Sequence, residues 1–135
     1  ENKSIILIDD SLVRGTTCHK IVKMLYESGA KEVHVRIACP EIKFPDFYGV
    51  DMPTKKELLA HEKNNREMCE YIKAKSLRFL SIKGLYKALI NEKRNQNYPQ
   101  FSDHYFTGDY PIKPYDNLLG YKVKQLSLLS GKSNS

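Results

Sequence analysis

The chain has 135 residues, enough for one compact domain and too few for two ordinary ones. Lysine and arginine number 22 against 16 aspartates and glutamates, which gives a formal charge of +6, and 41% of the residues are hydrophobic. This composition supports a core and argues against wholesale disorder, and no apolar run approaches the roughly 20 residues of a membrane span. The charge permits a polyanionic partner such as nucleic acid, but bulk charge alone does not identify one.

The cysteines and the first residue add two expectations. Cys18, Cys39 and Cys69 are odd in number and irregularly spaced, a pattern that fits neither a disulfide framework nor a zinc site. Free thiols and the absence of a signal-peptide pattern predict a reducing, cytoplasmic location. Because Glu1 stands only a few residues before a strong strand pattern, we expect the sequence to begin inside a domain.

The first part of the chain is typical of one strand–helix–strand crossover. A short β-branched run over 4–8 ends in two aspartates, as a buried parallel strand does at its carboxyl edge. Apolar residues recur at helical spacing over 18–25, the two threonines before them can cap that helix, and Gly29 suits a left-handed helix end. Alternation over 33–37 predicts a half-exposed strand. Such a crossover is the unit of a parallel α/β sheet.

The remainder of the chain is less regular. Prolines and a glycine make 40–53 irregular, and 54–57 fits a capping box that opens a helix through about residue 61. Further periodic segments predict a short helix at 68–72, a strand at 77–80, a helix at 82–89 and a helix at 118–129. Two or three strands are few for an independent sheet, which normally has about five or six.

The stretch that carries chemistry runs from Asp9 to Thr17. Asp9 and Asp10 follow a strand at the edge where α/β proteins bind ligands. The loop behind them supplies Gly15, which lets the backbone approach a ligand closely, and the hydroxyls of Thr16 and Thr17 at a helix N-terminus. Free backbone N–H groups and the helix dipole at that point favour an anion such as phosphate. Carboxylates one short step from a phosphate cradle suit a sugar phosphate.

Either half of this pattern, taken alone, has a simpler explanation. An acid pair usually marks a solvated strand end, and a Gly-Thr-Thr triplet usually caps a helix. Because one strand–loop–helix frame joins the two halves, together they favour a binding site over those explanations.

The stretch reads Asp9-Asp10-Ser11-Leu12-Val13-Arg14-Gly15-Thr16-Thr17 and resembles the phosphoribosyl pyrophosphate (PRPP) motif of type I phosphoribosyltransferases. Its particular form is similar to that of one family, the glutamine PRPP amidotransferases. Further blocks that resemble this family follow in the family's order: Pro40-Glu41-Ile42-Lys43-Phe44-Pro45, Phe47-Tyr48-Gly49-Val50-Asp51-Met52-Pro53-Thr54, Glu57-Leu58-Leu59-Ala60-His61, Ser76-Leu77-Arg78-Phe79-Leu80-Ser81, Gly84-Leu85 and Phe106-Thr107-Gly108-Asp109-Tyr110-Pro111. The resemblance spans residues 4–111 and corresponds to roughly the last quarter of such an enzyme.

The resemblance implies a fold and a division of the chain. The expected fold class is α/β: a partial type I phosphoribosyltransferase fold, with a parallel sheet flanked by helices, followed by a helical or irregular C-terminal segment. We expect residues 1–90 to be the C-terminal part of that domain. Residues 91–130 would be a wrapping segment and helix, and residues 131–135 a loose tail.

The resemblance also implies an activity and a binding site. The family makes 5-phosphoribosylamine from PRPP and glutamine, the first step of de novo purine biosynthesis. Asp9 and Asp10 would bind the ribose hydroxyls and help to hold Mg²⁺, while the loop over 11–17 would take the 5′-phosphate. The predicted PRPP-binding residues are therefore Asp9, Asp10, Ser11, Arg14, Gly15, Thr16 and Thr17. Arg14 belongs to the motif, but no catalytic step is assigned to it.

The family places a glutaminase domain with a catalytic N-terminal cysteine before this region, and that domain releases the ammonia that attacks the ribose. This chain has no such cysteine at its start, so we expect it to be inactive alone. For the parent enzyme, the resemblance implies PRPP and glutamine-derived ammonia as partners, purine nucleotides as inhibitors, and a homo-oligomer. It implies no membrane partner.

Some family members bind an iron–sulfur cluster through cysteines, one shortly before the Phe-Tyr-Gly block and others just before Phe-Thr-Gly. Here those places hold Asp46 and residues such as Ser102, Asp103, His104 and Tyr105. Because such a cluster needs thiolate ligands, we expect a member of the family without one.

Three alternatives stay open at this stage. A response-regulator receiver also opens with a strand, an acid pair and a serine, but Pro45 and Gly49 disfavour a central strand before Asp51. A nucleic-acid-binding regulator with a PRPP-type fold suits the positive charge, although the sequence has no helix-turn-helix or RNA-binding signature. An inactive remnant or a split-gene product is the third alternative.

Overall fold

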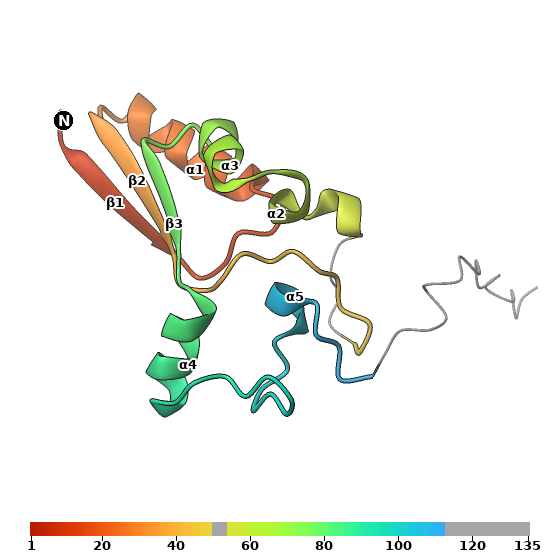
Figure 1. The fold of residues 1–135 in the computed structure, drawn as a ribbon. Helices are drawn as coiled ribbons and strands as arrows, with labels where there is room; N and C mark the ends of the chain where they lie inside the picture. The colour runs from red at the N-terminus through yellow and green to blue at the C-terminus, as the bar shows by residue number, and fades with distance from the viewer. Residues whose placement is uncertain (50–53, 113–135) are drawn as a thin grey trace, which may run out of the picture.

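The computed structural model describes residues 1–49 and 54–112 (Figure 1). Its elements, in chain order, are β1 (Ser4–Asp9), α1 (Thr16–Glu27), β2 (Glu32–Ile37), the 3₁₀ turn η1 (Lys55–Glu57), α2 (Leu59–Glu62), α3 (Asn65–Tyr71), β3 (Ser76–Phe79), α4 (Ile82–Ile90) and α5 (His104–Thr107). The predicted strands, and the helices predicted over 18–25, 68–72 and 82–89, are confirmed with small shifts of their bounds. The single helix predicted through about residue 61 is wrong, because an extended Leu58 separates the turn η1 from the short helix α2. The predicted helix over 118–129 and the tail over 131–135 lie outside the described residues. Within the described residues, no helix is long and apolar enough to cross a membrane.

The three strands form a parallel sheet in the order β1-β2-β3. In the register of this sheet, Leu7 stands opposite Val35, and Val35 stands opposite Leu77. Helices α1 and α3 lie together on one side of the sheet, while α4 continues away from the end of β3 (Figure 1). The crossovers through α1 and α3 place the carboxyl ends of all three strands at one edge, as parallel strands require.

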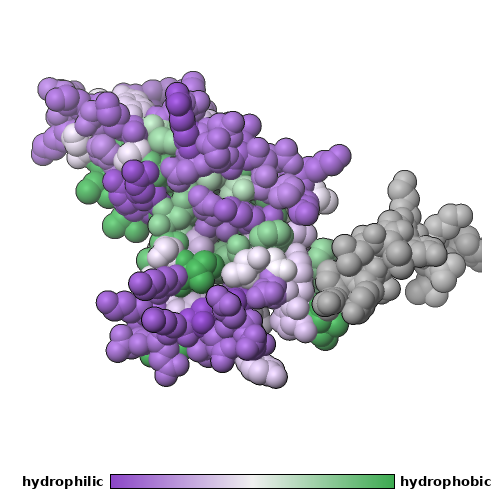
Figure 2. All heavy atoms as spheres, viewed as in Figure 1, coloured by the Kyte–Doolittle hydropathy of each residue, from purple (hydrophilic) through white to green (hydrophobic). Residues whose placement is uncertain are grey.

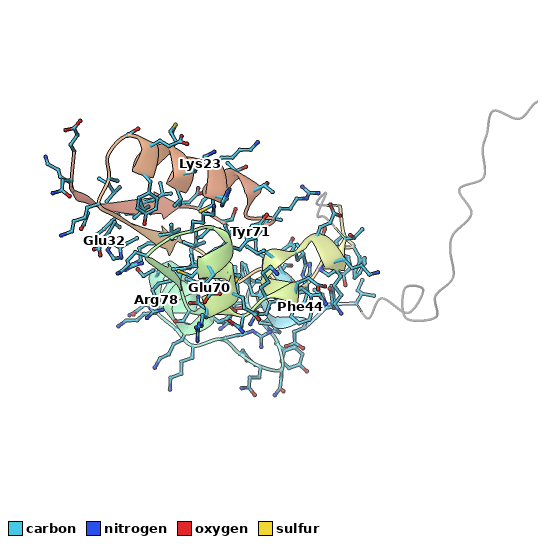
Figure 3. All side chains as sticks on the ribbon, turned by 90° about the horizontal axis from the view of Figure 1, so that it is seen from above. Lys23, Glu32, Phe44, Glu70, Tyr71 and Arg78 are labelled. Atoms are coloured by element: carbon cyan, nitrogen blue, oxygen red, sulfur yellow. The ribbon has the colours of Figure 1, made fainter. Side chains whose placement is uncertain are left out.

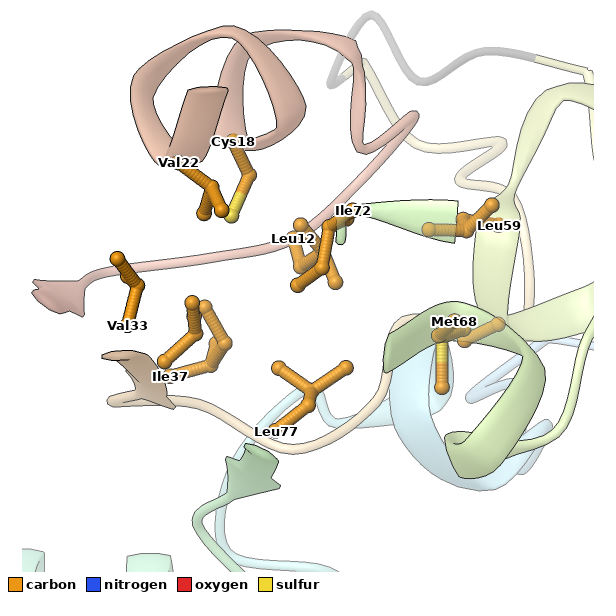
Figure 4. Packing of buried hydrophobic residues seen from close by; sticks show 11 residues of the cluster. Leu12, Cys18, Val22, Val33, Ile37, Leu59, Met68, Ile72 and Leu77 are labelled. Carbon is orange, nitrogen blue, oxygen red and sulfur yellow. The ribbon is translucent and has the colours of Figure 1, made fainter. Parts of the chain in front are cut away.

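The core lies between the sheet and these two helices. Its buried side chains, shown in Figure 4, come from β2 and β3, from helices α1, α2 and α3, and from residues that follow β1 and α3: Leu12, Cys18, Val22, Val33, Val35, Ile37, Leu59, Ala60, Met68, Ile72 and Leu77. Each fully buried aliphatic side chain of this kind contributes about 1.5–3 kcal/mol relative to exposure. The spacing of Cys18 and Val22 by one helical turn explains why α1 presents its apolar face to the sheet.

The prediction of a buried first strand was wrong for one of its faces. Side chains along β1 alternate, so that Ile5 and Leu7 are partly covered while Ile6 and Ile8 are 64% and 73% exposed. Figure 2 shows hydrophobic atoms at the surface on the side of the molecule where β1 lies. The physical reason is that α1 and α3 cover only the opposite face, and β1 pairs with β2 alone among the described strands.

The N-terminus of α1 is capped differently from the expectation. The two threonines make no side-chain cap on α1; Gly15 occupies the N-cap position with a left-handed φ of 76°. At the other end of α1, Gly29 adopts φ 91° and its N–H donates to the carbonyl of Tyr26, as predicted for a left-handed helix end. Thr16 and Thr17 are exposed. Because neither side chain caps the helix, the backbone N–H groups of its first turn remain available to a ligand.

The capping box of Thr54 and Glu57 is confirmed, with both of its reciprocal bonds present. It opens the 3₁₀ turn η1, and Leu58 then adopts an extended conformation before α2 begins at Leu59. Because Leu58 and Leu59 are both buried, this break turns two consecutive leucines inward.

Residues 103–112, here called the strap, run beside the loop that follows β2. The carbonyl of Tyr105 accepts hydrogen bonds from the backbone N–H groups of Lys43 and Phe44, and the Tyr110 hydroxyl donates to the carbonyl of Pro45. These bonds join segments about 60 residues apart and place the strap next to the carboxyl edge of the sheet.

Candidate functional site

The acid pair lies at the carboxyl end of β1, as predicted. Asp9 is the last residue of the strand, and its Oδ1 accepts a hydrogen bond of 3.0 Å from the backbone N–H of Asp10. The Ser11 hydroxyl donates to Oδ1 of Asp10 at 3.2 Å. These local bonds fix both carboxylates at the turn, and Asp10 is exposed.

A hollow of about 310 Å³ opens beside the acid pair, and residues 9–18 line it. The structure thus brings all seven sequence-predicted site residues to one hollow: Asp9, Asp10, Ser11, Arg14, Gly15, Thr16 and Thr17. Its charged lining consists of two carboxylates and one guanidinium, so a ligand there meets acidic and basic groups side by side.

The start of α1 gives the hollow its anion-binding character. The N–H groups of the first helical turn have no acceptors within the helix. No side chain caps them, and the first turn contains no acidic residue. Because Thr16 and Thr17 are exposed, their hydroxyls stand beside these donors at the positive end of the helix dipole.

The loop of the hollow is braced from behind by α2 and α3. Gly15 is buried, and a Cβ added there would lie 2.6 Å from Cδ2 of Leu59 and 3.1 Å from Cε1 of Tyr71. The backbone N–H of Leu59 donates to the carbonyl of Val13 at 2.9 Å. Figure 3 shows Tyr71 on the side of α3 that faces α1, where the carbonyl of Tyr71 lies 3.0 Å from Nδ1 of His19. These contacts leave no room for a side chain at position 15, which explains why the loop carries a glycine there.

We predict that Gly15→Ala destabilises the chain and distorts the hollow. The left-handed backbone alone costs a residue with a Cβ about 1–3 kcal/mol, and the contact with Leu59 adds to that cost. Urea unfolding monitored by circular dichroism measures the loss. The matched control is Gly49→Ala, because Gly49 has φ 119° but nothing within 4 Å of an added Cβ. An equal loss in both variants would show that crowding against Leu59 contributes nothing.

A buried thiol, Cys18, and a half-buried one, Cys39, lie near the acid pair. Burial raises the pKa of Cys18 to about 11, with a further contribution from the negative charge of Asp9. Burial likewise raises the pKa of Cys39 to about 11, and Asp10 adds to the effect. Both thiols therefore stay protonated near neutral pH and do not serve as nucleophiles.

We predict slow alkylation of these thiols in the folded chain. Since the thiolate is the reactive form, raising the pKa from 9.0 to about 11 lowers the thiolate fraction about 100-fold at pH 8. Iodoacetamide labelling followed by mass spectrometry gives the rate at each cysteine. The same reaction in 8 M urea is the control, and equal rates in both solvents would contradict the prediction.

An ion pair beside the hollow was not predicted. Oε1 of Glu57 accepts from Nε and Nη2 of Arg14 at 3.2 and 3.1 Å, while Oε2 accepts from the N–H and hydroxyl of Thr54. The bonds from Thr54, followed by that from Arg14, lower the pKa of Glu57. The capping box was visible in the sequence, but that signal does not show where the second carboxylate oxygen of Glu57 points.

The two places at which cluster-binding relatives would carry cysteines lie together. Oδ1 of Asp46 is 2.7 Å from Nε2 of His104, and both side chains are 1% exposed. Tyr48 packs edge-on against the His104 ring, and Ser102 and Tyr105 line the same hollow of about 190 Å³. Across the part of the chain that the structure describes, no three His, Cys, Asp or Glu residues form a group able to hold a metal ion.

A parallel α/β sheet, an acid pair at its carboxyl edge and a Gly-Thr-Thr loop opening the next helix define the class of type I phosphoribosyltransferases. The chain is 53% identical over 131 residues to an amidophosphoribosyltransferase of Rhizobium etli, and 49% identical over 123 residues to one of Staphylococcus aureus. These matches cover 96% and 91% of the chain. The chain therefore belongs to the amidophosphoribosyltransferase family and corresponds to the C-terminal phosphoribosyltransferase part of its members.

Solved structures agree with this assignment. Glutamine PRPP amidotransferase from Bacillus subtilis, complexed with ADP and GMP, matches 82% of the chain with a TM-score of 0.74 and 44% identity. A structure described as the allosteric regulatory enzyme of purine biosynthesis matches with a TM-score of 0.69 and 43% identity. The chain spans about a quarter of the length of the relatives that it matches. No family model matches the chain.

Proposed function

We propose that the chain forms the PRPP-binding part of an amidophosphoribosyltransferase, which converts PRPP, glutamine and water to 5-phosphoribosylamine, pyrophosphate and glutamate. The observation that carries the proposal is the single hollow lined by all seven motif residues, which combines two carboxylates with an uncapped helix N-terminus. A sugar phosphate carries hydroxyls and a phosphate at matching positions. The relatives do not favour a nucleic-acid-binding regulator or a receiver domain.

The acidic residues and the hydrogen-bond donors of the hollow bind different parts of the proposed ligand. Asp9 and Asp10 accept hydrogen bonds from the ribose hydroxyls. The N–H groups at the start of α1, with the hydroxyls of Thr16 and Thr17, bind the 5′-phosphate. As pyrophosphate leaves, positive charge develops on the anomeric carbon, and fixed carboxylates nearby stabilise that state more than the ground state.

Magnesium fits this donor set. Mg²⁺ is commonly held by one or two carboxylates together with substrate phosphate oxygens, so Asp9 and Asp10 suffice without a third protein ligand. When bound, the ion would neutralise negative charge on the pyrophosphate. The carboxylates themselves would orient the ribose hydroxyls.

Partners and setting follow from the family. The ammonia would come from a glutaminase domain, so we propose that this chain makes no phosphoribosylamine by itself. The Bacillus subtilis relative is complexed with ADP and GMP, which supports purine nucleotides as regulators of the parent enzyme. We further propose a homo-oligomeric parent in the cytoplasm, with residues 1–90 in the transferase domain, 91–130 as the wrapping segment and 131–135 as the tail.

Calorimetric titration of the full chain with PRPP in Mg²⁺ buffer tests the proposed site. We expect binding that weakens at least about tenfold in Asp10→Asn, because a charge-assisted bond is lost at the ribose. The control is Asp109→Asn, which removes an exposed carboxylate that does not line the hollow. Absence of PRPP binding, together with steeply salt-dependent RNA binding, would reject the proposed function in favour of the nucleic-acid alternative.

A further inference from the structure

The ion pair between Arg14 and Glu57 links the hollow to a turn 43 residues further along the chain. Glu57 is anchored independently of Arg14, because its Oε2 accepts from the N–H of Thr54 at 3.0 Å and from the Thr54 hydroxyl at 2.8 Å. Its Oε1 is thereby held toward the hollow. The carboxylate is thus a fixed acceptor rather than a side chain that follows the arginine.

Arg14 is held along one edge of its guanidinium. A guanidinium has five N–H donors in a rigid plane. Glu57 takes the Nε–H and one N–H of Nη2, at 3.2 and 3.1 Å. This pairing does not use the other edge of the guanidinium, which is formed by Nη1 and the second N–H of Nη2. The spacing of the donors on that edge matches two phosphate oxygens.

The charge of Arg14 is needed at this position. Among the described residues that line the hollow, Arg14 is the one cation, and it shares the lining with Asp9 and Asp10. A phosphate that enters beside two carboxylates requires a compensating positive charge. An arginine that moved freely would have to be immobilised at the moment of binding, which costs affinity.

We propose that Glu57 is a positioning residue: it holds the Arg14 guanidinium at the rim of the hollow, with its outer edge presented to the phosphate of a ligand. This inference rests on the proposed function for the identity of the ligand. The Arg14 and Glu57 side chains are 55% and 46% exposed, so solvent screens the repulsion between Glu57 and a phosphate. Orientation of the arginine is therefore the larger effect of Glu57, and its loss weakens binding.

The test compares three variants of the full chain. Glu57→Gln removes the fixed charge, and Thr54→Val removes the hydroxyl that anchors Glu57. Glu62→Gln is the matched control, because Glu62 is an exposed acid on α2 and its replacement changes the net charge equally. Titration with PRPP and Mg²⁺ measures affinity, and the Arg14 Nε–H signal in ¹H–¹⁵N NMR measures how firmly the guanidinium is held.

We expect Glu57→Gln to weaken PRPP binding about two- to fivefold, as the loss of an exposed ion pair permits. Thr54→Val should give a smaller loss in the same direction, and Glu62→Gln no loss. The Nε–H signal should broaden in the first two variants with or without ligand. Binding as tight as in the parent chain, or tighter, in Glu57→Gln would overturn the proposal.

The proposal and the proposed function fail separately. If the unaltered chain does not bind PRPP, the proposed function fails, and the ligand-free NMR signal still decides the positioning role. A persistent Arg14 Nε–H signal in Glu57→Gln would then reject that role. If PRPP binds and Asp10→Asn abolishes binding while Glu57→Gln does not change it, the positioning role alone is rejected.

Discussion

Replacing Asp103 with alanine should destabilise the folded chain by about 3–5 kcal/mol, the cost of breaking a buried ion pair from one side. Asp103 is 3% exposed, and its carboxylate accepts hydrogen bonds from Arg94, from the Tyr86 hydroxyl and from Thr107. The substitution would leave the guanidinium and a buried phenol without this acceptor. Urea unfolding monitored by circular dichroism measures the loss.

The acid side of the stability curve tests the same network. Burial of Asp103 raises the pKa of its carboxyl, but the bonds from Arg94 and Tyr86 outweigh this, so the pKa lies below its usual value. A lowered folded-state pKa means that the contribution is present above about pH 4 and is lost as the pH falls through the folded-state pKa. The parent chain should therefore lose stability below pH 4 more steeply than Asp103→Ala does.

Asp109→Ala is the matched control for this network. Asp109 accepts a bond of 2.8 Å from the same arginine, but its side chain is 59% exposed. An exposed pair contributes about 0–1 kcal/mol. Similar losses in Asp103→Ala and Asp109→Ala would show that burial does not decide the contribution of the network.

The second large effect is expected in activity rather than stability. In an intact amidophosphoribosyltransferase that contains this chain, Asp9→Asn or Asp10→Asn should lower PRPP-dependent phosphoribosylamine synthesis by about 10²–10³-fold, the usual range for removing one group that stabilises transition-state charge. Intrinsic glutamine hydrolysis should change much less, because the proposed role of the acid pair is to bind the ribose and not the glutamine. Coupled assays of phosphoribosylamine and glutamate separate the two activities.

Asp46 and Glu62 offer contrasting controls for that experiment. Glu62→Gln removes an exposed acid outside the hollow and should leave both activities unchanged. Asp46→Asn weakens the buried pair with His104 and should lower the thermal stability of the protein before it alters the ratio of the two activities. Unchanged synthesis in both Asp9→Asn and Asp10→Asn would count against the site.

The elements with local signals were predictable from the sequence. Alternation identified β2, the apolar face from Cys18 to Leu25 identified α1, and Thr54 with Glu57 identified a capping box. The position of the acid pair at a strand end followed in the same way. Each of these features depends on residues that are close together in the chain, so composition and spacing carry the information.

What could not be predicted depends on tertiary contacts. Exposure of Ile8 follows from the order of the strands and the placement of helices on one face, which local alternation does not report. The pairs Arg14–Glu57 and Asp46–His104 join residues 43 and 58 positions apart. A capping threonine at α1 was predicted from residue type, but the helix begins at Thr16 and Gly15 is its N-cap, at a place where Leu59 leaves no room for a Cβ.

The open face of β1 also determines how the chain should behave in solution. A strand that carries Ile6 and Ile8 outward and pairs on one side among the described strands is a template for attachment of another chain. The formal charge of +6 opposes such attachment by repulsion between copies. Salt shortens the reach of that repulsion from about 10 Å at 0.1 M to about 3 Å at 1 M. Ionic strength therefore sets the balance between solubility and self-association. Binding measurements should be made at low salt, where repulsion keeps the copies apart.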